Sequence, residues 1–302
     1  MYTLSDLGST IATAHSRIRQ AVYRLTDATT NITDEDWDNL ILLDACRYDQ
    51  FQRLASMDSP VEPRISVGSS TEEFLRRTFG TTEHHDIVYV TANPMHKNVG
   101  LDGTFHATID VWNTGWDETL RTVTPETVRE AAVAASETFP QKRLLVHFMQ
   151  PHYPFIGPTG REIEHAGFEW SYRLAMTGEG SRDSPTIWDH AEAGSVDIDR
   201  VWTAYDENLA LALEQVDHLL EIVRGRTVVT ADHGNFVGER IAPFDRRRFG
   251  HPDGVCAKTL RTVPWVVVTD ETRKHIRAEP PTDSVVGDIS TARSRLRDLG
   301  YV

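Results

Sequence analysis

The sequence has 302 residues, of which 39% are hydrophobic, and its formal net charge is −14. Seven Trp and eleven Phe exclude a disordered chain, and the length is sufficient for one large α/β domain with its own core. No apolar run approaches the roughly 20 residues that cross a bilayer, so we expect no transmembrane segment. An acidic chain repels nucleic-acid phosphates, and we therefore expect no nucleic-acid partner.

Cysteine usage and the basic residues bear on the environment of the protein. Cys46 and Cys256 cannot form a disulfide framework, and the first residues lack a signal-peptide core, so we expect a cytoplasmic location. Only four of the 31 basic residues are Lys, beside 25 Asp. Such a surface is typical of a halophilic protein, because at ~1 M salt the Debye length is only about 3 Å. A GC-rich genome that favours Arg codons would give the same bias.

The first predicted element is an amphipathic helix over residues 4–25, where apolar residues from Leu7 to Leu25 recur at helical spacing. Its three arginines, Arg17, Arg19 and Arg24, would also suit a membrane surface. We favour packing of this helix on the protein's own domain.

Five apolar runs then predict buried strands, and helical patterns over 125–139 and 201–223 lie among them. Strands that alternate with helices predict an α/β fold with a largely parallel sheet flanked by helices. We expect a single domain over residues 1–302. Residues 155–198 read as an irregular excursion whose aromatic side chains, Trp170, Tyr172 and Trp188, are candidates to line a substrate pocket. The five predicted strands are residues 39–45, 86–93, 143–150, 227–234 and 263–270.

Polar side chains finish these predicted strands. Asp44 ends the first, Asn93 follows the second, His152 follows the third, and Asp232 and His233 follow the fourth. Ligands of parallel sheets bind at the carboxyl ends of the strands, so these side chains should converge on one edge. Carboxylates and imidazoles together predict a site for Zn²⁺, Mn²⁺, Ca²⁺ or Mg²⁺. His147 lies within the third strand, and its direction is not fixed by the pattern.

Four segments resemble the sulfatase-like branch of the alkaline phosphatase superfamily, in the right order over roughly residues 38–270. The chain reads LILLDACRYDQF at the first strand, HFMQPHYPF after the third, VVTADHGNFVGER at the fourth, and FGHP before LRTVPWVVV. The resemblance implies that the chain has the fold of this superfamily. It also implies that the protein is a metal-dependent hydrolase of phosphate or sulfate esters. It also implies one divalent metal ion, held by Asp44, Asp232, His233 and a nucleophile.

The nucleophile in such enzymes opens the helix after the first strand, which here points to GSSTEEFLRRTF at 68–79. A hydroxyl at a helix N-terminus lies where backbone N–H groups can hold an oxyanion. We expect Thr71 to be both nucleophile and metal ligand. Ser70 is the second choice, and a simple N-cap role for either is the structural alternative.

Two departures from the family pattern narrow the chemistry. The Cys-x-Pro-x-Arg motif of sulfatases that mature a cysteine is absent from the sequence, which favours an unmodified Thr or Ser nucleophile and a phosphoester substrate. A second metal ion would need a further Asp and two His. His152 and His251 are available, but no matching Asp segment is evident, so we expect a single metal ion.

In the expected reaction, His152 and Arg47 or Asn93 meet the charge on the ester oxygens, and His251 protonates the leaving alcohol. The substrate would be a small anionic ester. Alternatives are a phosphoryl-group transferase with a lipid or glycan acceptor and a non-catalytic metal-binding relative. A dinucleotide-dependent oxidoreductase is disfavoured, because no Gly-x-Gly-x-x-Gly follows any predicted strand. The metal identity and the oligomeric state do not follow from the sequence.

Overall fold

The computed structural model describes residues 18, 20–21, 28–163, 165–179, 184–243, 245–269 and 272–282. The helix predicted over 4–25 lies almost entirely outside these ranges. Within them, no helix has both the length and the apolar character that a membrane span requires.

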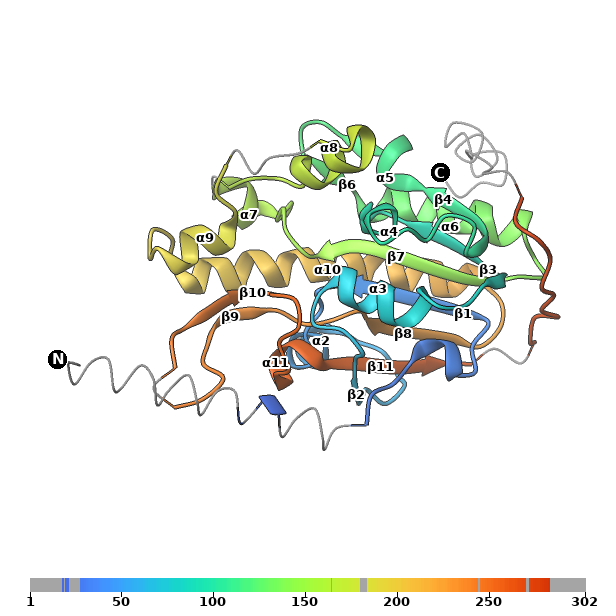
Figure 1. The fold of residues 1–302 in the computed structure, drawn as a ribbon, viewed down its shortest axis with the longest axis horizontal. Helices are drawn as coiled ribbons and strands as arrows, with labels where there is room; N and C mark the ends of the chain where they lie inside the picture. The colour runs from blue at the N-terminus through green and yellow to red at the C-terminus, as the bar shows by residue number, and fades with distance from the viewer. Residues whose placement is uncertain are drawn as a thin grey trace.

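A seven-stranded sheet runs through the centre of the fold, in the order β2-β11-β8-β1-β7-β3-β4 (Figure 1). β1 lies in the middle and pairs in parallel with both β7 and β8. The α/β fold with a largely parallel sheet is therefore confirmed. The strands of this sheet are β1 (Asn39–Asp44), β2 (Glu62–Ile65), β3 (His84–Thr91), β4 (Phe105–Asp110), β7 (Arg143–Pro151), β8 (Thr227–Ala231) and β11 (Thr262–Val268).

All five apolar runs predicted as strands belong to this sheet, but the last does not run in the predicted direction. β11 is antiparallel to both β8 and β2. The physical reason is the connection from β8, which holds a hairpin and a single helical turn. A parallel return needs a crossover, usually a full helix across one face. The two edge strands, β2 and β4, were not predicted, because their residues are partly exposed and form no apolar run.

Helices cover both faces of the sheet (Figure 1). α6 (Pro125–Thr138) and α10 (Ile198–Ile222) lie on one face, and α3 (Thr71–Phe79) lies on the other. Along β1, Ile41 and Leu43 pack toward α6 and α10, whereas Leu40 and Leu42 pack toward α3. Successive side chains of a strand point to opposite faces, so a strand covered on both sides must be apolar throughout.

The remaining elements are short, and several of them correct the prediction for residues 155–198. That segment was expected to be irregular, but it contains three helices, α7, α8 and α9. Short helices with exposed faces lack the long apolar stripe that reveals a helix in a sequence. The short elements are η1 (Ile32–Asp34), α2 (Tyr48–Leu54), α4 (Met95–Asn98), α5 (Val111–Thr114), α7 (Pro158–Glu162), α8 (Glu169–Thr177), α9 (Ile187–Glu192), α11 (Lys258–Arg261) and two strand pairs, β5 (Trp116–Asp117) with β6 (Thr122–Val123) and β9 (Phe236–Glu239) with β10 (Arg248–Gly250).

Candidate active site

The carboxyl ends of β1 and β8 and the first turn of α3 bring four predicted residues together. Asp44 is the last residue of β1, Asp232 and His233 directly follow β8, and Thr71 is the first residue of α3. Because β1 and β8 are parallel neighbours, their carboxyl ends meet at the same edge of the sheet. We refer to Asp44, Thr71, Asp232 and His233 as the cluster.

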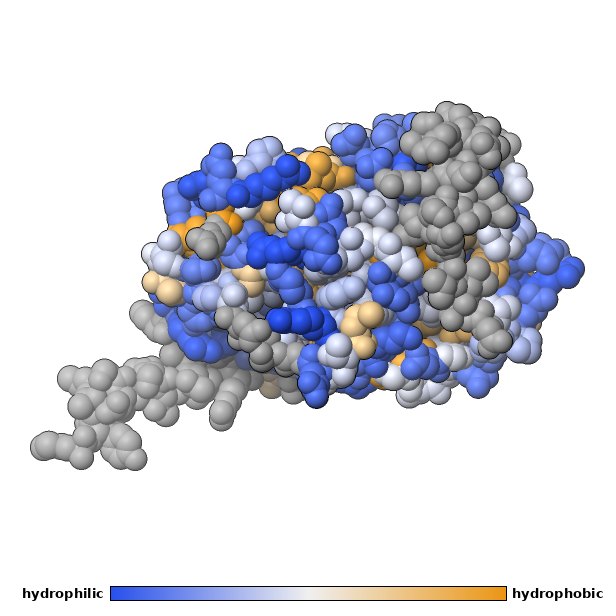
Figure 2. Space-filling view, turned by 90° about the horizontal axis from the view of Figure 1, so that it is seen from above, coloured by the Kyte–Doolittle hydropathy of each residue, from blue (hydrophilic) through white to orange (hydrophobic). Residues whose placement is uncertain are grey.

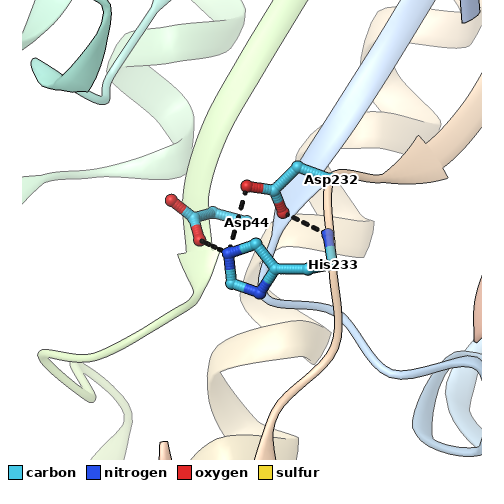
Figure 3. Close-up of side chains that lie close together, drawn as sticks. All are labelled: Asp44, Asp232 and His233. Carbon is cyan, nitrogen blue, oxygen red and sulfur yellow. Dashed lines mark hydrogen bonds and ion pairs between the residues drawn. The ribbon is translucent and has the colours of Figure 1, made fainter. Parts of the chain in front are cut away.

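The cluster is compact. One ligand atom from each of Asp44, Asp232 and His233 lies within 4.8 Å of the other two. Nε2 of His233 is 3.3 Å from Oδ2 of Asp232 and 3.7 Å from Oδ1 of Asp44, with the ring edge facing both carboxylates (Figure 3). Oγ1 of Thr71 is 2.8 Å from Oδ2 of Asp232 and 3.2 Å from Nε2 of His233. Four electron-rich atoms thus converge on one small volume.

A hydrogen bond of His233 decides which ring nitrogen faces the cluster. Nδ1 lies 2.8 Å from the carbonyl oxygen of Gly234, which can only accept, so Nδ1 carries the proton of the neutral ring. The Nε2 lone pair therefore points toward the carboxylates of Asp44 and Asp232. This is the tautomer that a metal-ligating histidine needs, with its second nitrogen held by the backbone.

Burial makes the charge of the cluster costly. Asp44 is 1% exposed, and Asp232 and His233 are 0% exposed. Burial and then the charge of Asp232 raise the pKa of Asp44 well above its ordinary value, and burial also raises the pKa of Asp232. Burial lowers the pKa of His233 to about 4, so this ring supplies no positive charge near neutral pH. Among the described ion pairs, none joins a Lys or Arg to either carboxylate, and a bound cation would relieve this imbalance.

Each carboxylate has one oxygen held by the protein and one directed at the cluster. Oδ2 of Asp44 accepts from Nδ2 of Asn93 at 2.5 Å. Oδ1 of Asp232 accepts from the backbone N–H groups of Ala45, at 3.0 Å, and His233, at 2.8 Å. Oδ1 of Asp44 and Oδ2 of Asp232 remain directed at Nε2 of His233. Two carboxylate oxygens, an imidazole nitrogen and a hydroxyl are a donor set that fits a divalent metal ion such as Zn²⁺ or Mn²⁺.

Ser70 and Thr71, the two candidates for the nucleophile, have different surroundings. Ser70 is the N-cap of α3: its Oγ accepts from the backbone N–H of Glu73 at 3.2 Å and donates to Oδ1 of Asp253 at 2.8 Å. The hydroxyl of Thr71 lies inside the cluster instead. The capping interpretation therefore describes Ser70, and Thr71 keeps the position expected of a nucleophile.

A cavity of 460 Å³ opens over the cluster, and both histidines expected at the site line it. Nδ1 of His152 lies 2.5 Å from the carbonyl oxygen of Tyr153 and must donate to it, which leaves Nε2 as an acceptor. Nε2 of His251 is 3.0 Å from that atom and therefore carries the proton between the two rings. The His251 ring also packs on His233, with 4.5 Å between ring centroids. We call this space the first cavity.

Arg47, which we expected to meet the negative charge of the substrate, instead contacts other residues of the protein. Its guanidinium pairs with Asp49 at 2.6 Å and with Glu239, and it lies 4.7 Å from the ring centroid of Trp202. It also donates to the backbone carbonyl of Asn235 at 3.0 Å, and it is absent from the walls of the first cavity. These contacts give Arg47 the role of joining β1 to the segment after β8. Asn93, the alternative to Arg47 for this role, bonds the carboxylate of Asp44 and also lines the first cavity.

Three residues near the cluster were not singled out for these roles by the sequence. The direction of His147 was open, and the structure turns its Nε2 toward Asp232, with Nδ1 2.8 Å from the hydroxyl of Tyr89. Asp253 bonds Ser70 and lines the first cavity. Ser66 donates to the backbone carbonyl of Asp232. Asp253 follows the motif FGHP by one residue, and that proximity to His251 is the one signal that could have marked it.

Two of the three aromatic side chains that we expected from residues 155–198 line the first cavity. Trp170 and Trp188 line the first cavity, whereas Tyr172 lines a neighbouring one.

The geometry defines a mostly parallel α/β protein with a buried carboxylate–imidazole cluster at the strand ends. The sequence matches no family model and no curated protein. Among solved structures, lipooligosaccharide phosphoethanolamine transferase A, an integral membrane protein from Neisseria meningitidis, aligns with a TM-score of 0.51 at 11% identity. The alignment covers 77% of this chain and 47% of that one, so the chain spans about half the length of this relative.

Two further structures have lower scores. A structure described as a 2-O GAG sulfatase gives a TM-score of 0.47 at 12% identity, over 87% of this chain and 70% of its own. The phosphonate monoester hydrolase of Silicibacter pomeroyi gives 0.40 at 14% identity, over 86% and 72%. The chain has the alkaline phosphatase-like α/β fold that the resemblance in the sequence implied.

Proposed function

We propose that this protein is a metal-dependent esterase for small anionic esters, with phosphoesters favoured over sulfate esters. Asp44, Asp232, His233 and Thr71 would hold one divalent metal ion, and Thr71 would be the nucleophile. The fold supports this proposal, because the superfamily consists of metal-dependent ester hydrolases and transferases.

One observation carries the proposal: the lone pair of His233 Nε2 is directed at two buried carboxylates and a hydroxyl. A set of caps and surface turns would be exposed to solvent. Here the two carboxylates are 0–1% exposed, and a cation bound between them would offset the free energy that burial of their charge costs. The adjoining hydroxyl belongs to a residue at a helix N-terminus, where backbone N–H groups favour an oxyanion.

The chain's own residues then have distinct tasks. A divalent ion, when bound, would lower the pKa of the Thr71 hydroxyl and withdraw charge from the ester. Thr71 Oγ1 passes its proton to Oδ2 of Asp232, to which it is hydrogen-bonded, and forms a bond to phosphorus as the bond to the leaving alcohol breaks. The proton on Nε2 of His251, which bonds His152 before the reaction, would pass to the leaving oxygen. Water then releases phosphate from Thr71 and gives its proton to His251, which lines the first cavity with His152.

Transfer to an alcohol is the second candidate function. The reaction would be the same up to the covalent Thr71 intermediate, and an acceptor alcohol would replace water. This alternative is kept because the Neisseria protein that shares the fold is a phosphoethanolamine transferase. Turnover with and without added alcohols separates the two candidates: a transferase releases the leaving group faster when an acceptor is present.

The experiment that tests the proposal combines metal content with turnover. Purified protein should hold about one divalent ion per chain by mass spectrometry, and should hydrolyse nitrophenyl phosphate or bis-nitrophenyl phosphate faster than nitrophenyl sulfate. Asp232→Ala should lose both the metal ion and the activity. No metal and no turnover of any ester, in folded protein supplied with Zn²⁺, Mn²⁺, Mg²⁺ and Ca²⁺, would contradict the proposal.

A further inference from the structure

A second cavity of 460 Å³ adjoins the first, and no residue of the cluster lines it. The two cavities share several walls, so an elongated molecule with one end over the cluster would have its other end here. The shared walls are Tyr153, Phe168, Trp170, Ser171 and Thr186.

Aromatic rings that contact one another line the second cavity. Trp116 stacks on Tyr172 with 4.4 Å between ring centroids and an interplanar angle of 22°. Tyr172 also contacts the buried ring of Trp112, which meets it edge-on with 6.1 Å between ring centroids. Trp116, Trp170 and Tyr172 all keep part of their surface exposed. Partly exposed aromatic rings that are held by ring–ring contacts offer apolar surface to a ligand with little loss of conformational entropy.

The polar side chains of this cavity are balanced in charge. Glu118 and Glu169 oppose Arg121 and Arg173, and Arg121 lies 3.3 Å from Glu169. An anionic or cationic ligand would gain nothing net from two charges of each sign. A neutral ligand with many hydroxyl groups would find both donors and acceptors around it. The balance also contrasts with the net charge of −14 of the whole chain.

We propose that the second cavity binds the sugar ring of a sugar-linked ester whose anionic group occupies the first cavity. A pyranose ring has a flat C–H face that packs on an aromatic ring and a rim of hydroxyl groups that bond charged side chains. The cavity volume lies within the usual range for small-molecule sites, roughly 300–1,000 Å³. The part of this proposal that concerns the ester rests on the proposed function, whereas ring binding can be measured without turnover.

The test uses neutral methyl glycosides of glucose, galactose, mannose and N-acetylglucosamine as probes. Saturation-transfer NMR should show contact with the ring protons of at least one of them, and titration should give a Kd near the millimolar range, about −4 kcal/mol at 1 mM. Trp116→Ala should weaken binding at least fivefold, and Trp116→Phe should stay within twofold, because it keeps a ring on Tyr172. Trp202→Phe is the matched control, because the Trp202 ring lines neither cavity. This variant should bind the glycoside with the Kd of the wild type.

Further variants keep the result interpretable. Arg173→Ala provides a second test should Trp116→Ala fail to fold. It changes an exposed side chain of the same cavity and should also weaken glycoside binding. Asp232→Asn should bind the glycoside as well as the wild type does. Binding in the absence of any ester turnover would support the sugar site and count against the proposed function. Failure of all four glycosides to bind, tighter binding of choline or adenosine at the same site, or full binding by both Trp116→Ala and Arg173→Ala would overturn the sugar site.

Discussion

Nε2 of His147 lies 3.8 Å from Oδ2 of Asp232, and neither side chain has any exposed surface. That separation is too long for a hydrogen bond, and in the described part of the chain this nitrogen has no other partner. The opposite nitrogen of the ring is held by the hydroxyl of Tyr89 at 2.8 Å. When the Tyr89 hydroxyl donates to Nδ1, the ring proton is on Nε2 and faces the carboxylate, where it can support that carboxylate once it binds a cation.

We therefore predict that His147→Gln weakens metal binding about 10-fold or more, a typical cost of losing a residue that orients a ligand. Titration of metal-free protein with Zn²⁺ or Mn²⁺ measures this. His106→Gln is the matched control, because it is another buried histidine whose Nδ1 bonds backbone carbonyls of the C-terminal segment. Equal metal affinity in the two variants would remove His147 from the site.

Adjacent hydroxyls at the start of α3 should give opposite results. Thr71→Ala should reduce kcat by about 10³-fold or more, because it removes the nucleophile. Ser70→Ala should leave kcat within about twofold and lower stability by roughly 1 kcal/mol, since it removes an N-cap. Steady-state turnover and thermal unfolding of both variants provide the measurements. Unaltered turnover in Thr71→Ala would contradict the assignment.

The raised pKa values of Asp44 and Asp232 make the stability of the metal-free protein depend on pH. A carboxyl whose folded pKa lies above its unfolded value contributes stability below the unfolded value, and that contribution is lost as the pH rises through the folded pKa. His233 acts in the opposite sense: with a folded pKa of about 4, its contribution is present above about 6.5 and lost as the pH falls toward 4.

From these signs, Asp232→Asn should raise the Tm of the metal-free protein at pH 8 by about 2 °C or more, because one buried negative charge is gone. The same variant should lose the increase in Tm that metal gives the wild type. Thermal unfolding between pH 5 and pH 9, in chelator and in excess Mn²⁺, measures both effects. The gain in chelator should shrink toward pH 5. A variant less stable than the wild type at pH 8 in chelator would contradict the account.

How far the sequence leads can be judged from particular elements. The buried strand β1 was predictable, because a continuous apolar run indicates a strand covered on both faces. The start of α6 at Thr124-Pro125 was predictable, because these residue types favour a helix N-terminus. Asp44, Asp232 and His233 were predictable as neighbours, because parallel strands end at one edge of the sheet. These conclusions needed no knowledge of distant contacts.

Other features depend on contacts that local order does not contain. The direction of His147 was open because β7 is buried on both faces, which removes the alternation that marks a strand's inner side. The reversal of β11 depends on how the chain returns from β8. The pairing of Arg47 with Glu239 joins residues 192 positions apart. Each is decided by tertiary packing.

The acidic composition leads to a prediction about salt. The view in Figure 2 shows a face covered mainly by hydrophilic residues, and the chain carries 45 acidic against 31 basic side chains. If the protein is salt-adapted, as we propose, repulsion among these charges is screened as the Debye length falls from about 10 Å at 0.1 M to 3 Å at 1 M. Tm should rise steadily over that range in both NaCl and KCl. A constant or falling Tm would favour codon bias as the origin of the composition.

Arg47 provides the sharpest separation between a structural and a catalytic role. Its side chain is 9% exposed and joins Asp49, Glu239 and the carbonyl of Asn235. Arg47→Met leaves those acceptors without their cation, and we expect a loss of about 2–3 kcal/mol, below the 3–5 typical of a fully buried pair because Asp49 is 62% exposed.

The activity of the folded Arg47→Met protein should stay within about twofold of the wild type, because the guanidinium does not line the first cavity. Arg53→Met is the matched control: this arginine pairs with Asp206 but is 50% exposed, so its loss should cost less than 1 kcal/mol. Denaturant unfolding and kcat, measured on both variants, check the prediction. A large fall in kcat with unchanged stability in Arg47→Met would return Arg47 to the reacting groups, since only contact with the ester would then explain it.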